Sequence, residues 1–144
     1  MSTNFEIERL EGDELLNFVV EYAFKRESEI NDLSLPVQTA YFISNFETEF
    51  YNGGVHQFLT NSSGRFADET IQSFTRVGAK QIASLLEAST NLDAELVLED
   101  DKAAASFQEI DDKLHQLYPS NEDGNVGEQL SLYLQENRSN ILES

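Results

Sequence analysis

The chain has 144 residues, which suits a single domain with one hydrophobic core. Its 27 Asp and Glu residues against 9 Lys and Arg residues give a net charge of −18, which argues against direct binding to nucleic acid and favours a basic partner. The absence of cysteine excludes disulfides, thiol nucleophiles and cysteine-based metal sites.

The sequence also bears on location. No stretch reaches the roughly 18 apolar residues of a membrane span. The first residues lack the basic and apolar regions of a secretory signal. We therefore expect a cytoplasmic protein that does not associate with a membrane.

The first part of the chain predicts two helices. Residues 1–12 are expected to form a loose N-terminal lead-in. Apolar residues at helical spacing predict a helix over residues 13–26, followed by a connector at residues 28–35. Pro36 suits the first turn of the next helix, because its missing N–H is not needed there. We expect that helix to cover residues 36–51.

The Asn-Gly-Gly run at residues 52–54 should end this helix, because Asn and Gly adopt the left-handed conformation at low cost. A short helix is expected at residues 55–60. Asn-Gly is also the strongest hairpin signal, and a rival prediction pairs residues 46–50 with residues 55–59 as two strands. We favour helices, because the apolar run begins about ten residues before the Asn-Gly and has a 3.6-residue period.

The rest of the chain predicts four more helices, with Gly78 ending the first and Pro119 ending the third. They are expected at residues 68–77, 79–88, 103–118 and 128–138. The predicted fold is an all-α, single-domain bundle of about six helices formed by residues 13–144.

Residues 41–78 are the expected centre of the core. They hold six of the ten Phe and four of the seven Gly residues. Charge is sparse here, since residues 41–90 carry only five acids and three bases. The six aromatic anchors are Phe42, Phe46, Phe50, Phe58, Phe66 and Phe74.

Three groups of residues are candidate sites of chemistry. His56 could act as a base or ligand, but no nucleophile motif lies nearby, so we interpret it as a capping or core histidine. His115 follows Asp111 and Asp112 at i+4 and i+3, but two ligands do not make a metal site. The Asn-Ser-Ser-Gly run at residues 61–64 is typical of a turn and lacks the G-x-S-x-G nucleophile elbow. We therefore assign no catalytic residue, no metal and no cofactor.

Acidic residues are concentrated on either side of the aromatic centre. Residues 1–40 carry nine acids and three bases, and residues 91–123 carry ten acids and two bases. Carboxylates spaced over a surface can imitate DNA phosphates, which follow one another every 1.7 Å or so along the duplex axis. The predicted partner-binding residues are Asp93, Glu95, Glu99, Asp100, Asp101, Glu109, Asp111 and Asp112.

One pattern near the centre is specific enough to compare with a family. It comprises Glu49, Asn52, Gly53, Gly54, His56, Gln57, Phe58, Asn61, Ser62, Ser63 and Gly64, then Gly78 and Ala79. This pattern, NGGxHQF followed by NSSG, resembles a bacterial family catalogued as a domain of unknown function, whose best-known member is an acidic DNA-mimic protein. The resemblance extends more weakly through Leu114, Tyr118 and the last helix, and it implies an all-α fold. We interpret the motif as structural, because a mimic acts through surface acids outside it.

These observations predict a non-enzymatic protein that binds a basic protein. One specific form of this function is a DNA mimic that occupies the DNA-binding surface of a transcription regulator. The alternative is a hydrolase or metal-dependent enzyme that uses His56 and nearby carboxylates. The sequence leaves open whether the chain forms a homodimer.

Overall fold

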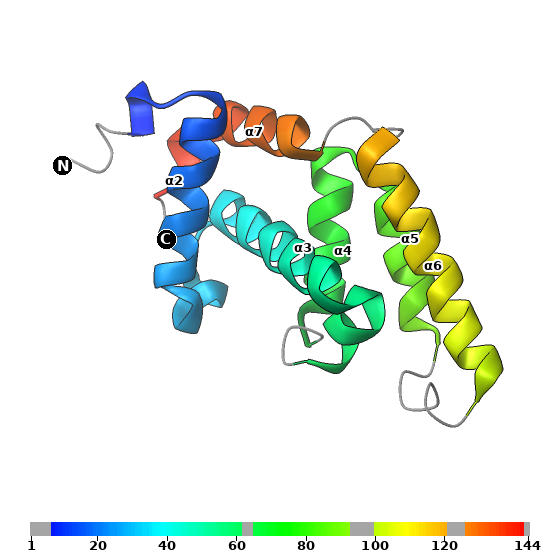
Figure 1. Ribbon diagram of the computed structural model, residues 1–144. Helices are drawn as coiled ribbons and strands as arrows, with labels where there is room; N and C mark the ends of the chain where they lie inside the picture. The colour runs from blue at the N-terminus through cyan, green and yellow to red at the C-terminus, as the bar shows by residue number, and fades with distance from the viewer. Residues whose placement is uncertain (1–6, 62–64, 93–99, 121–125, 143–144) are drawn as a thin grey trace.

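The computed structural model describes residues 7–61, 65–92, 100–120 and 126–142, and every element in these ranges is helical. The predicted all-α fold is therefore confirmed (Figure 1). Its elements are α2 (Gly12–Lys25), η1 (Glu27–Asp32), α3 (Leu35–Thr60), α4 (Ala67–Val77), α5 (Lys80–Thr90), α6 (Asp101–Ser120), α7 (Val126–Glu136) and η4 (Arg138–Asn140).

Each predicted helix matches an observed one, with small differences at the ends. Pro119 does not end the helix predicted at residues 103–118, because α6 runs through it to Ser120. Pro36 lies in the first turn of α3, as predicted. The predicted connector at residues 28–35 differs, because most of it forms the 3₁₀ helix η1. The side chain of Ile30 is only 3 % exposed, so η1 is anchored in the core by one apolar residue rather than left as a free loop.

The later part of the predicted lead-in is packed against the C-terminal segment. Residues 7–9 are helical, and Ile7 is buried. Arg138 donates hydrogen bonds to the backbone carbonyls of Glu8, at 2.9 Å, and Leu10, at 2.8 Å. Residues 1–6 lie outside the described part of the chain.

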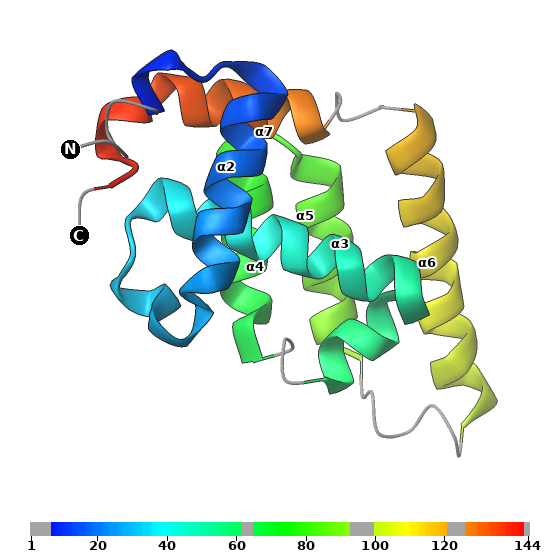
Figure 2. The same cartoon turned by 60° about the vertical axis from the view of Figure 1, so that its left-hand side comes forward.

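The central element is α3, which contacts α2, α4, α5, α6 and α7 (Figure 2). Phe46 is fully buried, and its ring centroid lies 5.5 Å from that of Phe50, 5.0 Å from Phe58 and 5.5 Å from Phe74. Two of these contacts are edge-to-face, a favoured arrangement for aromatic pairs. Burying each such side chain contributes about 1.5–3 kcal/mol, so this cluster is the main hydrophobic centre of the fold.

Gly54 divides α3 into two helical arms. Its φ of 78° and ψ of −175° interrupt the helix, and a short second arm runs from Val55 to Thr60. The predictions of a helix end and a short following helix are both confirmed. The rival hairpin is wrong, because residues 46–50 and 55–59 are helical. The apolar period before the break extends over enough turns to outweigh the local turn signal.

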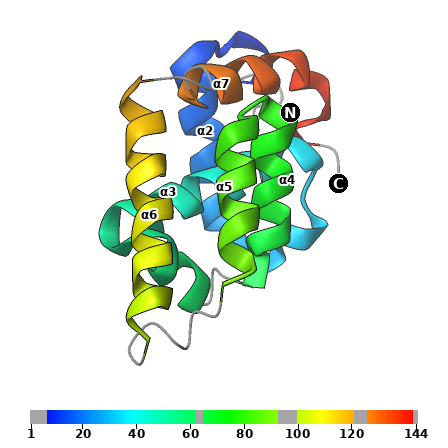
Figure 3. The ribbon, with the colours of Figure 1, turned by 90° about the vertical axis from the view of Figure 1, so that its right-hand side faces the viewer.

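The remaining helices surround α3. Gly78 ends α4 and turns the chain into α5, with Ala79 N–H bonded to the Phe74 carbonyl at 2.9 Å. This six-to-one bond belongs to the Schellman motif that ends many helices. Helix α6 runs antiparallel beside α5 (Figure 3), and α2 and α6 lie on opposite sides of the molecule (Figures 1 and 2).

No helix within the described ranges is long and apolar enough to cross a lipid bilayer.

Candidate partner-binding surface

Helix α6 presents a row of exposed carboxylates to solvent. Asp101, Glu109 and Asp112 are all exposed. At about 100° per residue, these positions fall within an arc of about 80° on the helix surface. We call these three residues the acidic stripe. The buried residues Phe107 and Leu114 lie on the other side of α6, so packing of the apolar face turns the stripe outward.

The other predicted partner-binding residues divide into three groups. Asp100 is exposed, and its Oδ1 accepts a hydrogen bond from the backbone amide of Lys102 at 2.9 Å, as expected of a residue that caps the start of α6. Asp111 is half-buried and turned toward α3. The rest lie outside the described residues: Asp93, Glu95 and Glu99.

Asp111 joins α6 to the break in α3. Its Oδ1 accepts a hydrogen bond from the backbone amide of Val55 at 2.8 Å. A Cβ added to Gly54 would lie only 2.6 Å from Asp111 Oδ2, so the carboxylate is in close contact with the glycine. Asp111 therefore satisfies a free amide at the start of the second arm, as an N-cap does within one helix.

Burial raises the pKa of Asp111 above its ordinary value, because the charged form loses solvation. The hydrogen bond from Val55 and the charges of His115 and His56 oppose this rise in pKa, and the charge of Asp112 adds to it. The sequence does contain a signal for this inward position. Asp111 lies four residues after Phe107 and three before Leu114, a spacing typical of a helix's buried face.

The two histidines pack against aromatic rings. The His56 ring is edge-on to Phe107, with 5.5 Å between centroids. The His115 ring lies 4.5 Å from Phe50. Over the part of the chain that the structure describes, no three His, Cys, Asp or Glu side chains are grouped to hold a metal ion. Both imidazole rings therefore pack against aromatic side chains.

The motif residues connect the two arms of α3. The carboxylate of Glu49 accepts hydrogen bonds from Gln57 Nε2 at 3.1 Å and from Asn61 Nδ2 at 2.7 Å. Asn52 and Gly53 are exposed beside the break. Glu49 therefore holds the second arm against the first. Three motif residues lie outside the described part: Ser62, Ser63 and Gly64.

Several arginines donate hydrogen bonds to neutral oxygens. Arg26 donates to the Tyr22 carbonyl at 3.3 Å, and Arg76 donates to Thr39 Oγ1 at 2.7 Å. Arg138 donates to two backbone carbonyls, as described above. These contacts hold the three guanidinium groups against the fold, and their positive charges are already included in the net charge of −18.

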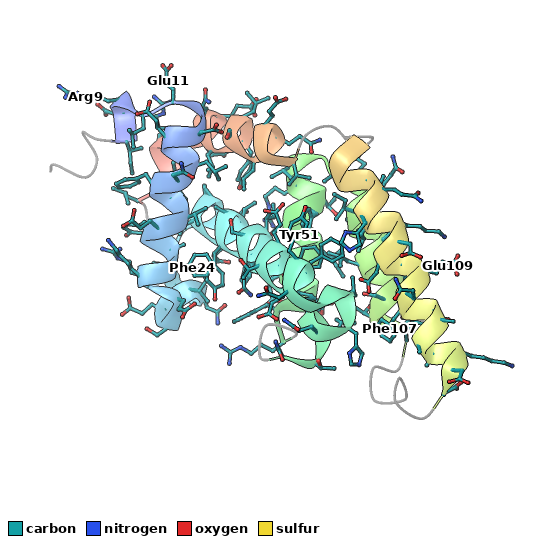
Figure 4. All side chains as sticks on the ribbon, viewed as in Figure 1. Arg9, Glu11, Phe24, Tyr51, Phe107 and Glu109 are labelled. Carbon is teal, nitrogen blue, oxygen red and sulfur yellow. The ribbon has the colours of Figure 1, made fainter. Side chains whose placement is uncertain are left out.

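Acidic groups also occur at the far side of the molecule from the stripe. Figure 4 labels Glu11, just before α2, and Glu109, on α6, and the two lie toward opposite ends. The helices between them contain the sparsely charged centre of the sequence. Exposed acids are therefore found at both ends of the molecule.

Fold and surface define this chain as an all-α acidic protein whose carboxylates are displayed on exposed helix faces. The chain belongs to the DMP19-like protein family, whose model matches residues 31–137. The match covers α3 through α7 and includes both the Gly54 break and the acidic stripe. No curated protein and no solved structure shows a significant match to the chain.

Proposed function

We propose that this protein is a non-enzymatic acidic binding protein that acts as a DNA mimic toward a basic protein partner. The observation that carries the proposal is the acidic stripe: Asp101, Glu109 and Asp112 lie exposed on one face of α6. Membership of the DMP19-like family and the net charge of −18 support it. The partner would be a DNA-binding protein such as a transcription regulator.

The number of carboxylates on this face of α6 is closer to the number of phosphates on one DNA strand than on a whole duplex. Asp101 and Asp112 are separated by about 16 Å along the helix axis. One DNA strand carries about five phosphates over that length, and a duplex about ten. The stripe together with Asp100 supplies four carboxylates. A partner that recognises a single phosphate backbone therefore fits α6 best.

The positions of His56 and Asp111 support a non-enzymatic role. The His56 ring packs on Phe107, and the Asp111 carboxylate accepts the Val55 amide. These two groups, which a hydrolase or metal enzyme would need, both make contacts that hold α3 against α6. The proposal includes no direct binding to nucleic acid, because phosphates would be repelled by this surface.

The test compares two triple variants with the same change in net charge. The stripe variant is D101N/E109Q/D112N. The control, E21Q/E29Q/D32N, neutralises three exposed acids of α2 and η1 on the opposite side. The two sets are matched, because Glu109 pairs with Lys113 at 3.1 Å and Glu21 pairs with Lys25 at 3.0 Å, both at i, i+4.

Wild type and both variants would be used to capture partners from a cell extract at low and high salt. We expect the stripe variant to lose the captured DNA-binding protein and the control to retain it. Binding should weaken as salt rises, because exposed charges are screened beyond about 8–10 Å. Duplex DNA should displace the wild-type protein. A partner that binds this protein and DNA together, without loss of affinity for either, would reject mimicry.

A further inference from the structure

A groove of about 400 Å³ lies between α5 and α6, which are side by side in Figure 3. Its size is within the range of small-molecule sites, roughly 300–1,000 Å³. It borders the acidic stripe, because Lys113 at its edge forms an exposed i, i+4 ion pair with Glu109 of the stripe at 3.1 Å. Such an exposed pair contributes little stability, so Lys113 can also interact with a bound anion. Its lining residues are Lys80, Gln81, Ser84, Leu85, Lys113, Gln116 and Leu117.

The lining is positively charged in a strongly acidic protein. Two of the four lysines of the chain, Lys80 and Lys113, line this groove although they belong to different helices. Its lining contains no Asp or Glu. By contrast, a second groove, between residues 7–8 and the C-terminal segment, is lined by Glu8, Glu136 and Arg138, and a third, on α2, is lined by Glu21 together with Lys25 and Arg26. Among these three grooves of the described residues, the α5–α6 groove is the one whose lining has lysines and no acid, and this composition favours an anion.

The start of α5 adds to this positive charge. Helices α2, α4, α6 and α7 each carry at least one acid in the first turn, where it offsets the positive end of the helix dipole. Helix α5 has no acid in its first turn and begins with Lys80, and its N-cap, Ala79, has no side chain that could cap it. A cation at this position is unfavourable for the helix. A bound anion would offset both charges.

The groove also has an apolar wall. Leu85 is half-buried and Leu117 is 6 % exposed. Ser84 and Gln81 are exposed beside them and supply hydrogen-bonding groups. We propose that this groove binds a small organic carboxylate with an apolar body, its carboxylate between Lys80 and Lys113 and its apolar part against the two leucines.

The probe for the first test is octanoate, followed by amide chemical-shift changes in nitrogen-15-labelled full-length protein. Octanoate should shift amides at residues 80–85 and 113–117 in a saturable manner. Two control ligands test the two parts of octanoate separately. Acetate has the carboxylate without the long alkyl group, and 1-octanol has the alkyl group without the charge. We expect neither control ligand to cause saturable chemical-shift changes at these amides. Equal saturation by 1-octanol, or octanoate shifts confined to other helices, would overturn the proposal.

The second test uses variants. K80Q/K113Q should raise the Kd for octanoate about tenfold or more, whereas K25Q/K102Q, with the same net charge, should change it by no more than about twofold. K80R/K113R should retain binding, because the charge is kept. The substituted lysines are exposed, so circular dichroism should show unchanged helix content. Equal weakening in both glutamine variants would mean that overall charge, not this groove, governs binding and would reject the site.

Discussion

Asp111 on α6 accepts a hydrogen bond from the amide of Val55, the first residue after the Gly54 break in α3, with 2.8 Å between Oδ1 and N. The two residues are 56 positions apart in the sequence. The same carboxylate touches Gly54. One side chain of α6 therefore caps the second arm of α3 and also leaves no room for a larger residue at position 54. This contact fixes α6, and with it the acidic stripe, against the centre of the fold.

Gly54→Ala should destabilise the protein strongly. At φ 78° and ψ −175° the backbone is in a region that is essentially restricted to glycine, so alanine pays about 1–3 kcal/mol there, and its Cβ would lie 2.6 Å from Asp111 Oδ2. We expect a total loss of about 2–4 kcal/mol in the free energy of unfolding, measured by urea denaturation. Gly12→Ala is the control, because Gly12 also has positive φ but no atom within 4 Å of the added Cβ. Equal losses in the two variants would show that the Asp111 contact is unimportant.

Asp111→Ala should lower stability by about 1–2 kcal/mol, because the Val55 amide loses its acceptor in a half-buried position. Its neighbour Asp112 is exposed and accepts from Gln108 on its own helix. Asp112→Ala should therefore change stability by no more than about 0.5 kcal/mol. Amide hydrogen exchange at Val55 should accelerate in the Asp111 variant alone. Unchanged exchange there would contradict the capping role.

Glu49→Ala should release the second arm of α3. The carboxylate accepts from both Gln57 and Asn61, so its removal should cost about 1–2 kcal/mol. Glu87→Ala, at an exposed position of α5, serves as the control and should cost no more than about 0.5 kcal/mol. Thermal unfolding followed by circular dichroism would compare them. The prediction fails if the two variants melt at the same temperature.

Alkaline pH should destabilise the protein through Tyr41. Burial, together with the hydrogen bond to Glu27 at 3.1 Å and that residue's charge, raises the pKa of Tyr41 from 10.0 to about 12. The folded chain therefore holds the phenol proton more tightly than the unfolded chain. This contribution to stability is present below pH 10.0 and is lost as the pH rises to about 12.

Unfolding of wild type and Tyr41→Phe, measured across this alkaline range, would detect the contribution. The stability of wild type should fall relative to the variant as the pH rises. Tyrosinate absorbance of the variant should lack the group that titrates at about 12 in wild type, whereas Tyr51, whose pKa burial also raises, should titrate late in both proteins. Parallel pH profiles for the two proteins would contradict the raised pKa.

The sequence by itself determined where the helices lie. Apolar periodicity located each one, and Pro36 and Gly78 marked a helix start and a helix end, because these signals act within a few residues of backbone. The Asn-Gly-Gly run likewise indicated the break that the structure places at Gly54, since only glycine adopts φ 78° at little cost.

Tertiary structure decided which side chains of different helices contact one another and which face solvent. Asp111 and Asp112 are adjacent acids in the sequence, yet packing of α6 turns the first toward Val55 and leaves the second in solvent. The meeting of Lys80 with Lys113 in one groove depends in the same way on how α5 and α6 pack. Periodicity specifies which face of a helix is buried, but the partner of that face depends on the packing of distant segments, which local pattern does not encode.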